Sequence, residues 1–526
     1  MSPLRHPVFR ALWIASAVSA IGTWMQDLGA VWLMTSLSPS PLLVALIQTA
    51  GSLPFFMLAL PAGAIADVVD RRRMLLFTQG WMLVAATLLG VFTLAGITTP
   101  WVLLVFTFAL SLGSAMNMPV WQAIIPELVA KDELPSAVAL SGIVINLARA
   151  IGPALAGIIL ATAGGPGAVF LVNALTFVGV IVVIYRWRRI PKPSGLPAER
   201  VWGAIQAGIR FTRFWKPLQI VLVRTGTYIF CGSALFALLP ILGRQELGLD
   251  AVGYGIILGF WGLGGLLGAF ILPKAQKRLS VDTLVAIATF LYATMTLTLA
   301  YLRNYYLVCG VMIFVGIGSL TLMASFNVAA QTVVPGWVRA RALAFQLLVF
   351  QGAMAAGSFL WGAIAQRAGL SIALTGASMG LLAGLLIALR FPLNCGKNLD
   401  LAPSLHWRQQ TLVFEPYPDD GPVLIQLEYH VDPQQADEFV EAMQPIGVMR
   451  RRDGAIQWGL FHDLTQCGRF VESFIVESWV EHKRQFERVT NSDRILQDRA
   501  RSFHISDQPP KVFQMIYANR TDERKC

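Results

Sequence analysis

Three ionisable side chains lie inside long apolar stretches of the chain, where a charge is costly. Asp27 lies six residues before the end of the stretch Phe9–Leu33. Arg149 lies thirteen residues from either end of Ser136–Thr162, and Arg224 lies near the start of another stretch. Ionisable groups in such surroundings are functional candidates by default. A buried carboxyl that gains and loses a proton can exchange that proton for a bound molecule, which is the chemistry expected of Asp27.

Each of these charges also has a structural explanation. Asp27 could cap its helix or reach outward to water. Arg149 lies too deep to reach water by extending its side chain, so it either contacts a cargo or forms an ion pair between helices. Arg224 lies close enough to one end of its stretch for its guanidinium to extend to the surface, which is the expected arrangement. The sequence therefore nominates Asp27 and Arg149 for proton coupling and transport.

Uncharged polar residues inside the apolar stretches are the next candidates. Some would line a cavity, and others would only bridge helices at about 0.6 kcal/mol each. The candidates for cavity lining are Gln48, Asn117, Gln122, Asn146, Asn327 and Gln351. The chain has no Gly-x-x-x-x-Gly-Lys-Ser/Thr phosphate loop, so ATP is not expected as the energy source. Its five Cys are scattered without a CxxC pair, so neither a disulfide framework nor a zinc site is suggested. No metal and no other cofactor is expected.

Two short motifs carry glycines at positions where helices would approach closely. The segment from Gly63 to Arg73 reads Gly-Ala-Ile-Ala-Asp-Val-Val-Asp-Arg-Arg-Arg. Gly63 would allow close helix contact, and Asp67 would lie at a helix end within reach of Arg71, Arg72 and a neighbouring helix. Such a pairing would latch the two halves of the protein in one conformational state.

The second motif follows Arg149 in the fifth apolar stretch. It reads Gly-Pro-Ala-Leu-Ala-Gly and comprises Gly152, Pro153 and Gly157. Proline kinks a helix, and glycine lets another helix pack against it. A bent, closely packed helix is therefore predicted here.

The elements that position these residues are membrane-spanning helices. Hydrophobic residues make up 55% of the 526 residues and charged residues only 13%, against about 25% charged residues in soluble proteins. A span needs about 20 mostly apolar residues. Twelve such stretches follow one another: Phe9–Leu33, Leu42–Ala66, Met74–Ala95, Trp101–Ile124, Ser136–Thr162, Ala168–Tyr185, Leu218–Leu239, Val252–Leu272, Val281–Leu302, Leu307–Val328, Ala342–Ala365 and Ile372–Leu389.

The charges of the connecting segments predict the orientation. With the N-terminus inside, the inner segments carry 21 Lys and Arg and the outer loops carry three. This asymmetry obeys the positive-inside rule and predicts a multi-pass membrane protein with both termini in the cytoplasm. The net charge of +11 resides in the membrane part, because residues 398–526 hold 15 Lys and Arg against 20 Asp and Glu. A nucleic-acid partner is therefore not expected.

The twelve spans divide into two halves of six. The segment Gln122-Ala-Ile-Ile-Pro126 before the fifth span matches Gln331-Thr-Val-Val-Pro335 before the eleventh. A tandem repeat of this kind is typical of transporters that rock two halves around a central site. The predicted domains are an N-terminal half at 1–190, an amphipathic cytoplasmic linker at 191–216, a C-terminal half at 217–393, a second linker at 394–421 and a soluble domain at 422–519. The linker helix is expected to lie on the inner membrane surface.

The soluble domain shows alternating strand and helix patterns. Strands are predicted at Val423–Val431, Ile456–His462, Phe470–Trp479 and Val512–Tyr517, and helices lie between them. The order βαββααβ is that of a ferredoxin-like α+β unit. Helices on one face would leave the other sheet face uncovered, so a homodimer through this domain is expected.

The motifs resemble a known transporter family. Residues 63–73 resemble the major facilitator superfamily motif Gly-x-x-x-Asp-x-x-Gly-Arg-Arg/Lys, with Asp70 at the usual second Gly. Residues 149–157 resemble the Gly-Pro-x-x-Gly-Gly motif of its exporters, with Ala156 replacing one Gly. Together with the opening segment His6–Trp13, they make residues 1–395 similar to the enterobactin-exporter-like branch of transmembrane secretion effectors. The resemblance implies an all-α bundle of twelve transmembrane helices.

The soluble domain resembles a second family. Residues 477–485 are similar to the strand-to-helix junction of antibiotic-biosynthesis-monooxygenase-like domains. Its four histidines, His430, His462, His482 and His504, have no metal-ligand spacing on one helix. Solvated or structural roles are expected for them, so the resemblance is taken to imply the fold and not the catalysis. A dimerising or ligand-sensing domain is favoured over an enzyme, and no catalytic residue is assigned.

These patterns together predict a secondary active transporter. The expected function is proton-driven export of an amphipathic small molecule, such as a siderophore or an antibiotic, by alternating access in the lipid bilayer. One alternative is an uptake symporter, against which the Gly-Pro motif argues by resemblance. Another is a bifunctional protein whose soluble domain modifies the cargo before export.

Overall fold

The chain folds into two compact units. The computed structural model describes residues 2–130, 132–162, 165–187, 201–393, 399–404, 406–407, 415–506 and 508–517. The first unit comprises Met1–Ala198, Leu222–Val328 and Ala344–Leu393, and the second comprises Glu199–Val221, Ala329–Leu343 and Asn394–Cys526. The second unit thus contains the predicted soluble domain together with two inner segments of the membrane part.

Each of the twelve predicted apolar stretches corresponds to one helix that is long and apolar enough to cross a membrane. Proline stands at the first position of several of them, where it costs no hydrogen bond. The helices are α1 (Pro7–Leu37), α2 (Pro41–Val68), α3 (Arg71–Leu94), α4 (Pro100–Leu128), α5 (Leu134–Thr162), α6 (Pro166–Arg186), α8 (Lys216–Ile241), α9 (Ala251–Gln276), α10 (Val281–Tyr301), α11 (Tyr305–Thr332), α12 (Arg339–Ala368) and α13 (Leu370–Arg390).

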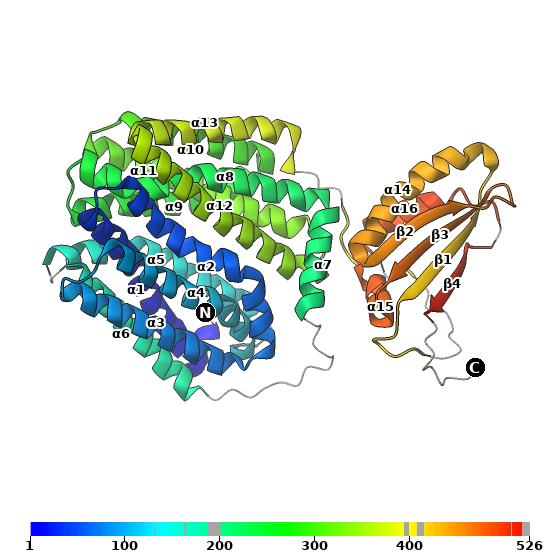
Figure 1. Ribbon diagram of the computed structural model, residues 1–526, viewed down its shortest axis with the longest axis horizontal. Coiled ribbons are helices and arrows are strands. Elements are labelled where there is room, and N and C mark those ends of the chain that lie inside the picture. The colour runs from blue at the N-terminus through cyan, green and yellow to red at the C-terminus, as the bar shows by residue number, and fades with distance from the viewer. Residues whose placement is uncertain are drawn as a thin grey trace. The chain divides into compact units, whose positions relative to one another are not determined.

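The helices of the bundle pack side by side (Figure 1), and glycines allow the tightest crossings described. Within the first six helices α3 packs against α4 and α6, within the last six α10 packs against α13, and α5 packs against α9. The closest approach joins α9 and α11. A Cβ atom added at Gly264 would lie 2.0 Å from the Ile313 carbonyl oxygen, and one added at Gly316 would lie 2.2 Å from that of Trp261. Only glycine fits at these two crossings, as is typical of membrane helix pairs.

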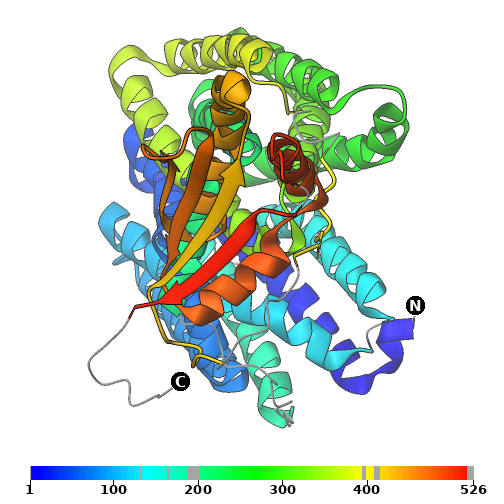
Figure 2. The same cartoon turned by 90° about the vertical axis from the view of Figure 1, so that its right-hand side faces the viewer.

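The second unit contains a four-stranded antiparallel sheet. Its strands are β1 (Val423–His430), β2 (Ala455–His462), β3 (Arg469–Val476) and β4 (Lys511–Ile516), in the order β2-β3-β1-β4. Figure 2 shows β4, in red, at one edge beside β1. The helices are α14 (Ala436–Asp453), α15 (Trp479–Arg488) and α16 (Asn491–Arg501). The element order is the predicted one.

One face of this sheet forms the core of the second unit. Alternate residues of β1 and β3 are buried, and they pack with apolar residues of α14. The opposite face leaves large apolar side chains exposed, among them Phe461, Phe513 and Met515. Buried charges inside the unit are paired: Arg450 binds Glu472, and Arg452 binds Asp453 and Asp493. Pairing of this kind is what buried charges require.

The amphipathic linker helix α7 (Val201–Phe214) belongs to this second unit. Arg210 forms a 2.9 Å ion pair with Glu481 of α15. The guanidinium of Arg452 lies over the ring of Trp215, 5.0 Å from its centroid. Phe211 is buried. This helix was predicted to lie on the inner membrane surface; in the structure it packs against α14.

Candidate functional site

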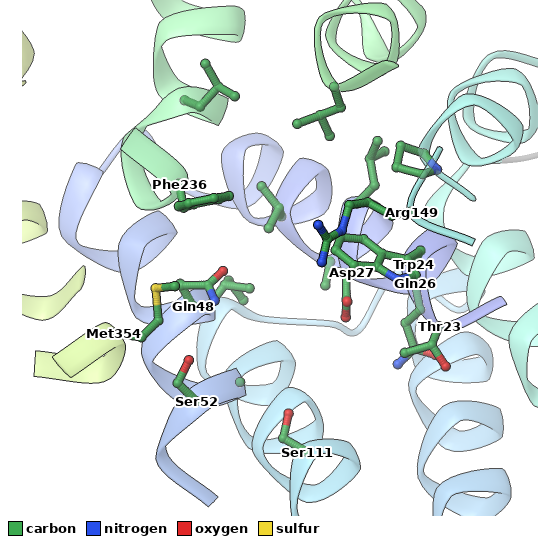
Figure 3. Close-up of a pocket in the computed structure, with 18 of the residues that line it drawn as sticks. Thr23, Trp24, Gln26, Asp27, Gln48, Ser52, Ser111, Arg149, Phe236 and Met354 are labelled. Atoms are coloured by element: carbon green, nitrogen blue, oxygen red, sulfur yellow. The ribbon is translucent and has the colours of Figure 1, made fainter. Parts of the chain in front are cut away.

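A large cavity opens between the two sets of six helices in the first unit. Its volume is about 780 Å³, and every helix of the first six as well as α8, α9, α11 and α12 contributes to its lining. Figure 3 shows Asp27, Arg149 and Trp24 grouped on one wall, with Gln48, Phe236 and Met354 across from them. A pocket of this size suits a drug-sized molecule.

The structure brings together only part of the predicted set. Asp27, Gln48, Arg149, Pro153, Asn327 and Gln351 line the cavity. Asn117 does not: its Oδ1 accepts a 3.0 Å hydrogen bond from Thr78 Oγ1 between α3 and α4. Gln122 is exposed on α4, and the side chain of Asn146 lies outside the described residues. Asn117 is therefore a bridge between helices, the alternative considered for such residues.

Asp27 opens into the cavity from the middle of α1. It lies ten residues before the last residue of that helix, so it does not cap the helix end. Its side chain is accessible, and the space that it faces is the cavity. Within the described part of the chain its carboxylate has neither a hydrogen bond nor an ion pair. A free carboxylate in this place can bind a proton or a cation.

Arg149 enters the cavity from α5 between two indole rings. Its Cζ lies 5.4 Å from the centroid of the Trp24 ring on α1 and 5.6 Å from that of Trp261 on α9. Its Nε is buried without a hydrogen-bond partner. The ion pair between helices that was one expectation for Arg149 is absent among the described residues. Contact with the two rings stabilises the charge without neutralising it.

Glycines of the second motif set the spacing around Arg149. A Cβ atom added at Gly152 would lie 2.6 Å from Cβ of Trp24, and one added at Gly157 would lie 3.2 Å from the Ala251 carbonyl oxygen. Gly152 therefore lets α1 approach α5 so that Trp24 reaches the guanidinium. Gly157 brings α5 equally close to the start of α9.

The arginines of the first motif bind neighbouring helices of the same half. Arg71 Nη1 donates 2.7 Å to Glu127 Oε1 and 2.9 Å to the carbonyl oxygen of Ala123, both on α4. Arg72 donates to the carbonyl oxygens of Ile184 and Tyr185 on α6. Gly63 and the side chain of Asp67 lie outside the part of the chain whose side chains the structure describes. Glu127 is a partner that the motif did not indicate.

Arg224 does not extend to the surface as expected. Its Nη1 forms an ion pair with Asp282 Oδ1 at the start of α10, and the Arg224 side chain is only 5% exposed. Asp282 also accepts a 2.9 Å hydrogen bond from the backbone N–H of Leu393. The expectation was wrong because Asp282, which is 58 residues away in the chain, lies on an adjacent helix. A carboxylate on a neighbouring helix stabilises a buried guanidinium, so the arginine side chain does not have to extend to water.

The hydrogen bonds described between the two halves gather toward one end of the bundle. Arg244 binds the side chains of Thr35 and Ser36, and its guanidinium lies over the Trp32 ring at 5.0 Å. Beside it, Ser40 Oγ donates 2.7 Å to Gln366 Oε1, and Trp32 stacks on Tyr254. This end carries the loops that were predicted to lie outside.

The histidines of the second unit form no metal site among the described residues. His482 is buried, and neither of its ring nitrogens has a hydrogen-bond partner. Burial lowers the pKa of His482 to about 4, with Gln485 and Arg450 beside it. His482 is therefore a neutral core residue, packed between Trp479 and Phe486.

Several lining residues escaped the sequence analysis. They are hydroxyl and amide side chains of modest polarity: Thr23, Gln26, Ser52, Ser111 and Ser114. Helical spacing would have found some of them, since Thr23 lies four residues before Asp27 and Ser52 lies four residues after Gln48. A hydroxyl gives a weak signal because it can donate its hydrogen bond to a carbonyl oxygen of its own helix, as Thr23 Oγ1 does to the Ser19 carbonyl oxygen.

Comparison with known proteins supports the transporter interpretation. The staphyloferrin A transporter of Staphylococcus aureus is 24% identical over 347 residues, which cover 65% of this chain and 85% of that protein. The multidrug efflux pump Tap of Mycolicibacterium fortuitum is 26% identical over 412 residues, or 76% and 98% of the two chains. The enterobactin exporter EntS of Shigella boydii is 24% identical over 286 residues, or 54% and 67%.

A solved structure shares the fold of the bundle. A bacterial homologue of the human lysosomal transporter Spinster, in an inward-facing and occupied conformation, superposes with a TM-score of 0.59 at 14% identity, covering 74% of this chain and 96% of that one. The family model described as transmembrane secretion effector matches residues 1–522, which is nearly the whole chain. The protein therefore belongs to the transmembrane secretion effectors, a family of major facilitator superfamily transporters and not of enzymes.

Proposed function

We propose that the protein is a proton-driven exporter of an amphipathic small molecule, such as a siderophore or a drug, that works by alternating access. The observation that carries the proposal is the cavity of about 780 Å³ between the two sets of six helices, with Asp27 and Arg149 inside it. Relatives named as siderophore and multidrug exporters support export over uptake. The cargo is the partner, and protons supply the energy.

Asp27 is the proposed proton carrier. It faces the cavity without a hydrogen bond or an ion pair in the described part of the chain, so proton binding there breaks no existing interaction. A carboxyl surrounded by helices is costly when charged and inexpensive when neutral. Asp27 can therefore alternate between a protonated state and a deprotonated state as access to the cavity changes.

The structure is proposed to represent the state that opens inward. The contacts of Arg244 with Thr35 and Ser36, and of Ser40 with Gln366, join the halves at the end assigned to the outside by loop charge. These contacts have to break when the cavity opens outward. The motif residues Gly63, Asp67, Arg71 and Arg72 are proposed to latch the opposite end, and Gly152, Pro153 and Gly157 to shape α5.

The protein is proposed to lie in the bacterial inner membrane with both termini in the cytoplasm. Support comes from the 21 basic residues on one side against three on the other. The second unit would then be cytoplasmic. Its sheet order β2-β3-β1-β4 supports a ferredoxin-like fold, and the exposed Phe461, Phe513 and Met515 support homodimer formation through the open sheet face.

Everted membrane vesicles from cells that express the protein test the main proposal. Respiration acidifies the vesicle lumen, and a pH-sensitive dye reports that gradient. Adding enterobactin as the cargo should release protons from the lumen in vesicles with the protein and not in matched vesicles without it. Cargo accumulation that persists after the proton gradient is collapsed would contradict proton coupling, and loss of cargo from preloaded cells only in the absence of the protein would contradict export.

A further inference from the structure

Arg149 presents an unsatisfied cation to the cavity. Its Nε is buried without a hydrogen-bond partner, and no carboxylate lies within ion-pair distance among the residues described. A buried N–H donor without an acceptor costs about 1–3 kcal/mol, and more when it is charged. A protein keeps such a group where something absent from the free protein satisfies it.

The two indoles hold the guanidinium without supplying a hydrogen-bond acceptor. Trp24 and Trp261 contact it at 5.4 Å and 5.6 Å. Trp261 is itself fixed, since its Nε1 donates 3.2 Å to Ser319 Oγ and its ring packs edge-to-face on Phe236 at 5.0 Å. Ring faces offset part of the cost of the charge, while the N–H groups stay available for hydrogen bonds to an oxyanion.

We propose that Arg149, held between Trp24 and Trp261, is the receptor for an oxyanion on the cargo, and that the cargo is an anionic aromatic amphiphile. This inference rests on the proposed function and specifies its substrate class. A carboxylate, a sulfonate or an ionised phenol all supply the oxygen acceptors that a guanidinium binds, often through two parallel hydrogen bonds.

The remaining walls fit the uncharged part of such a molecule. Phe236 and Met354 contribute apolar surface, and Gln48, Asn327 and Gln351 contribute neutral amides. Asp27 is the one other charged residue among those lining the cavity. When Asp27 is protonated, Arg149 is the only charge left there, so the cavity then favours an anion over a cation.

The position of Arg149 ties the bound anion to both halves. Arg149 and Trp24 come from the first six helices, and Trp261 comes from α9 in the last six. Gly152 permits the approach of Trp24, and a Cβ atom added at Gly262 would lie 3.6 Å from Cα of Ala150, where α9 crosses α5. An oxyanion bound beside Arg149 therefore lies next to residues of both sets of six helices.

The test compares two probes that share a skeleton. The anion 8-anilinonaphthalene-1-sulfonate and the uncharged N-phenyl-1-naphthylamine differ by one sulfonate, and both fluoresce in apolar sites. Binding to full-length protein in phosphatidylcholine nanodiscs is measured after subtraction of empty nanodiscs. The wild type should bind the anion at least about tenfold more tightly than the neutral probe, and Arg149→Gln should remove that preference while neutral-probe binding stays.

Two further variants make the test decisive. Arg149→Lys should keep a reduced preference for the anion, because it retains the charge and loses the planar fork. Arg367→Gln, at an exposed arginine in the last turn of α12, should change neither probe. A wild type without anion preference, or a monodisperse Arg149→Gln protein that keeps it, would overturn the inference. If Arg149→Gln does not fold, the wild-type ratio and the Lys variant decide.

Binding in nanodiscs requires no proton gradient, so this result is separate from the vesicle experiment. Anion preference without proton-coupled flux would overturn the proposed function and leave the cargo assignment standing. Proton-coupled flux in a protein that has no anion preference would overturn the cargo assignment and leave the proposed function standing.

Discussion

Asp27 and Arg149 are opposite charges that share one cavity without pairing. Between isolated charges in apolar surroundings, an ion pair would form at once if the geometry allowed it. Here the two indole rings contact Arg149, and Asp27 lies on the same wall of the cavity without an ion pair to it among the described residues. Each charge is therefore available to an external partner, a proton for one and an oxyanion for the other. Arg224 shows the contrast, because its ion pair with Asp282 leaves it no such role.

Asp27→Asn should abolish proton-coupled flux while preserving cargo binding. The amide has the shape of the protonated acid and cannot release a proton. Cargo-induced proton release in everted vesicles should fall at least about tenfold, and binding of N-phenyl-1-naphthylamine in nanodiscs should stay unchanged. The matched control is Asp250→Asn, since Asp250 caps α9 through Gly253 N–H and asparagine caps nearly as well. Normal proton release in Asp27→Asn would direct the search to other carboxyls.

His482 should make the second unit less stable as pH falls. Its pKa is lowered to about 4 in the folded state by burial, against about 6.5 in the unfolded chain. Between these values the unfolded chain binds more protons, so stability decreases as pH falls through this window. From pH 6.5 to 5 the loss should be about 2 kcal/mol. Hydrogen exchange of β1 and β3 amides in the full-length protein, corrected for intrinsic rates, measures it.

His482→Leu is the variant that tests this assignment. It should remove most of the pH dependence between 6.5 and 5, because leucine cannot bind the proton. His462→Leu, at an exposed histidine, should retain it. Equal pH dependence in His482→Leu and the wild type would assign the effect to another group.

At the scale of the helices, glycines decide how closely elements approach. Gly264 and Gly265 are neighbours on α9 with opposite surroundings. A Cβ atom at Gly264 would collide with the backbone of α11, whereas one at Gly265 would meet nothing within 4 Å. Gly264→Ala should therefore destabilise the bundle by about 1–3 kcal/mol and lower the thermal unfolding temperature in detergent. Gly265→Ala should cause no loss, and equal melting of the two variants would contradict the crossing of α9 and α11.

In the proposed inward-open state, Arg244 should keep the outer end of the bundle closed. Its hydrogen bonds to Thr35 and Ser36 and its contact with the Trp32 ring join α1 to the end of α8. Losing two or three contacts of about 0.5–1 kcal/mol each should shift the balance toward the outward-open state by about 5- to 150-fold. Val31 lines the cavity. A cysteine introduced there by Val31→Cys reports the share of the outward-open state through its reaction rate with a membrane-impermeant thiol reagent.

Arg244→Ala should raise that rate, and Arg367→Gln should not. An unchanged rate in a folded Arg244→Ala protein would mean that other contacts hold the outer end closed.

Across the whole molecule, apolar run length predicted the twelve helices well, because a span must satisfy its backbone internally and must be long. Alternation likewise placed the strands of the second unit. Membership of the cavity was predicted only in part, since it depends on how each helix is rotated about its axis. Asn117 faces Thr78 and Gln48 faces the cavity, although both are amides within spans. Pairs between distant segments, such as Arg224 with Asp282 and Arg71 with Glu127, left no local signal.

The second unit joins the C-terminal sheet domain to two segments of the membrane part, Glu199–Val221 and Ala329–Leu343, which no composition pattern indicated. Besides the Arg210–Glu481 pair, the guanidinium of Arg488 lies 4.7 Å from the ring centroid of Trp337, in the segment between α11 and α12. Trp215 Nε1 donates 2.6 Å to the Val333 carbonyl oxygen. The C-terminal sheet domain thus holds the linker helix α7 and the α11–α12 segment together, and through the chain both continue into spans of the C-terminal half.

Trp337→Ala should loosen this attachment without unfolding the sheet. The substitution removes the ring that Arg488 and Phe211 contact, and an aromatic contact with a partly desolvated guanidinium contributes about 1–2 kcal/mol. Amides of α7 should then exchange about five- to thirtyfold faster, while amides of β1 and β3 keep their protection. Trp101→Ala, at an exposed tryptophan on α4, should leave α7 unchanged.

A chain that ends at Lys397 should show still faster exchange in α7 and keep its twelve helices inserted, because their apolar surface faces lipid and other spans. Unaltered α7 exchange in both variants would mean that α7 is held by the membrane part alone.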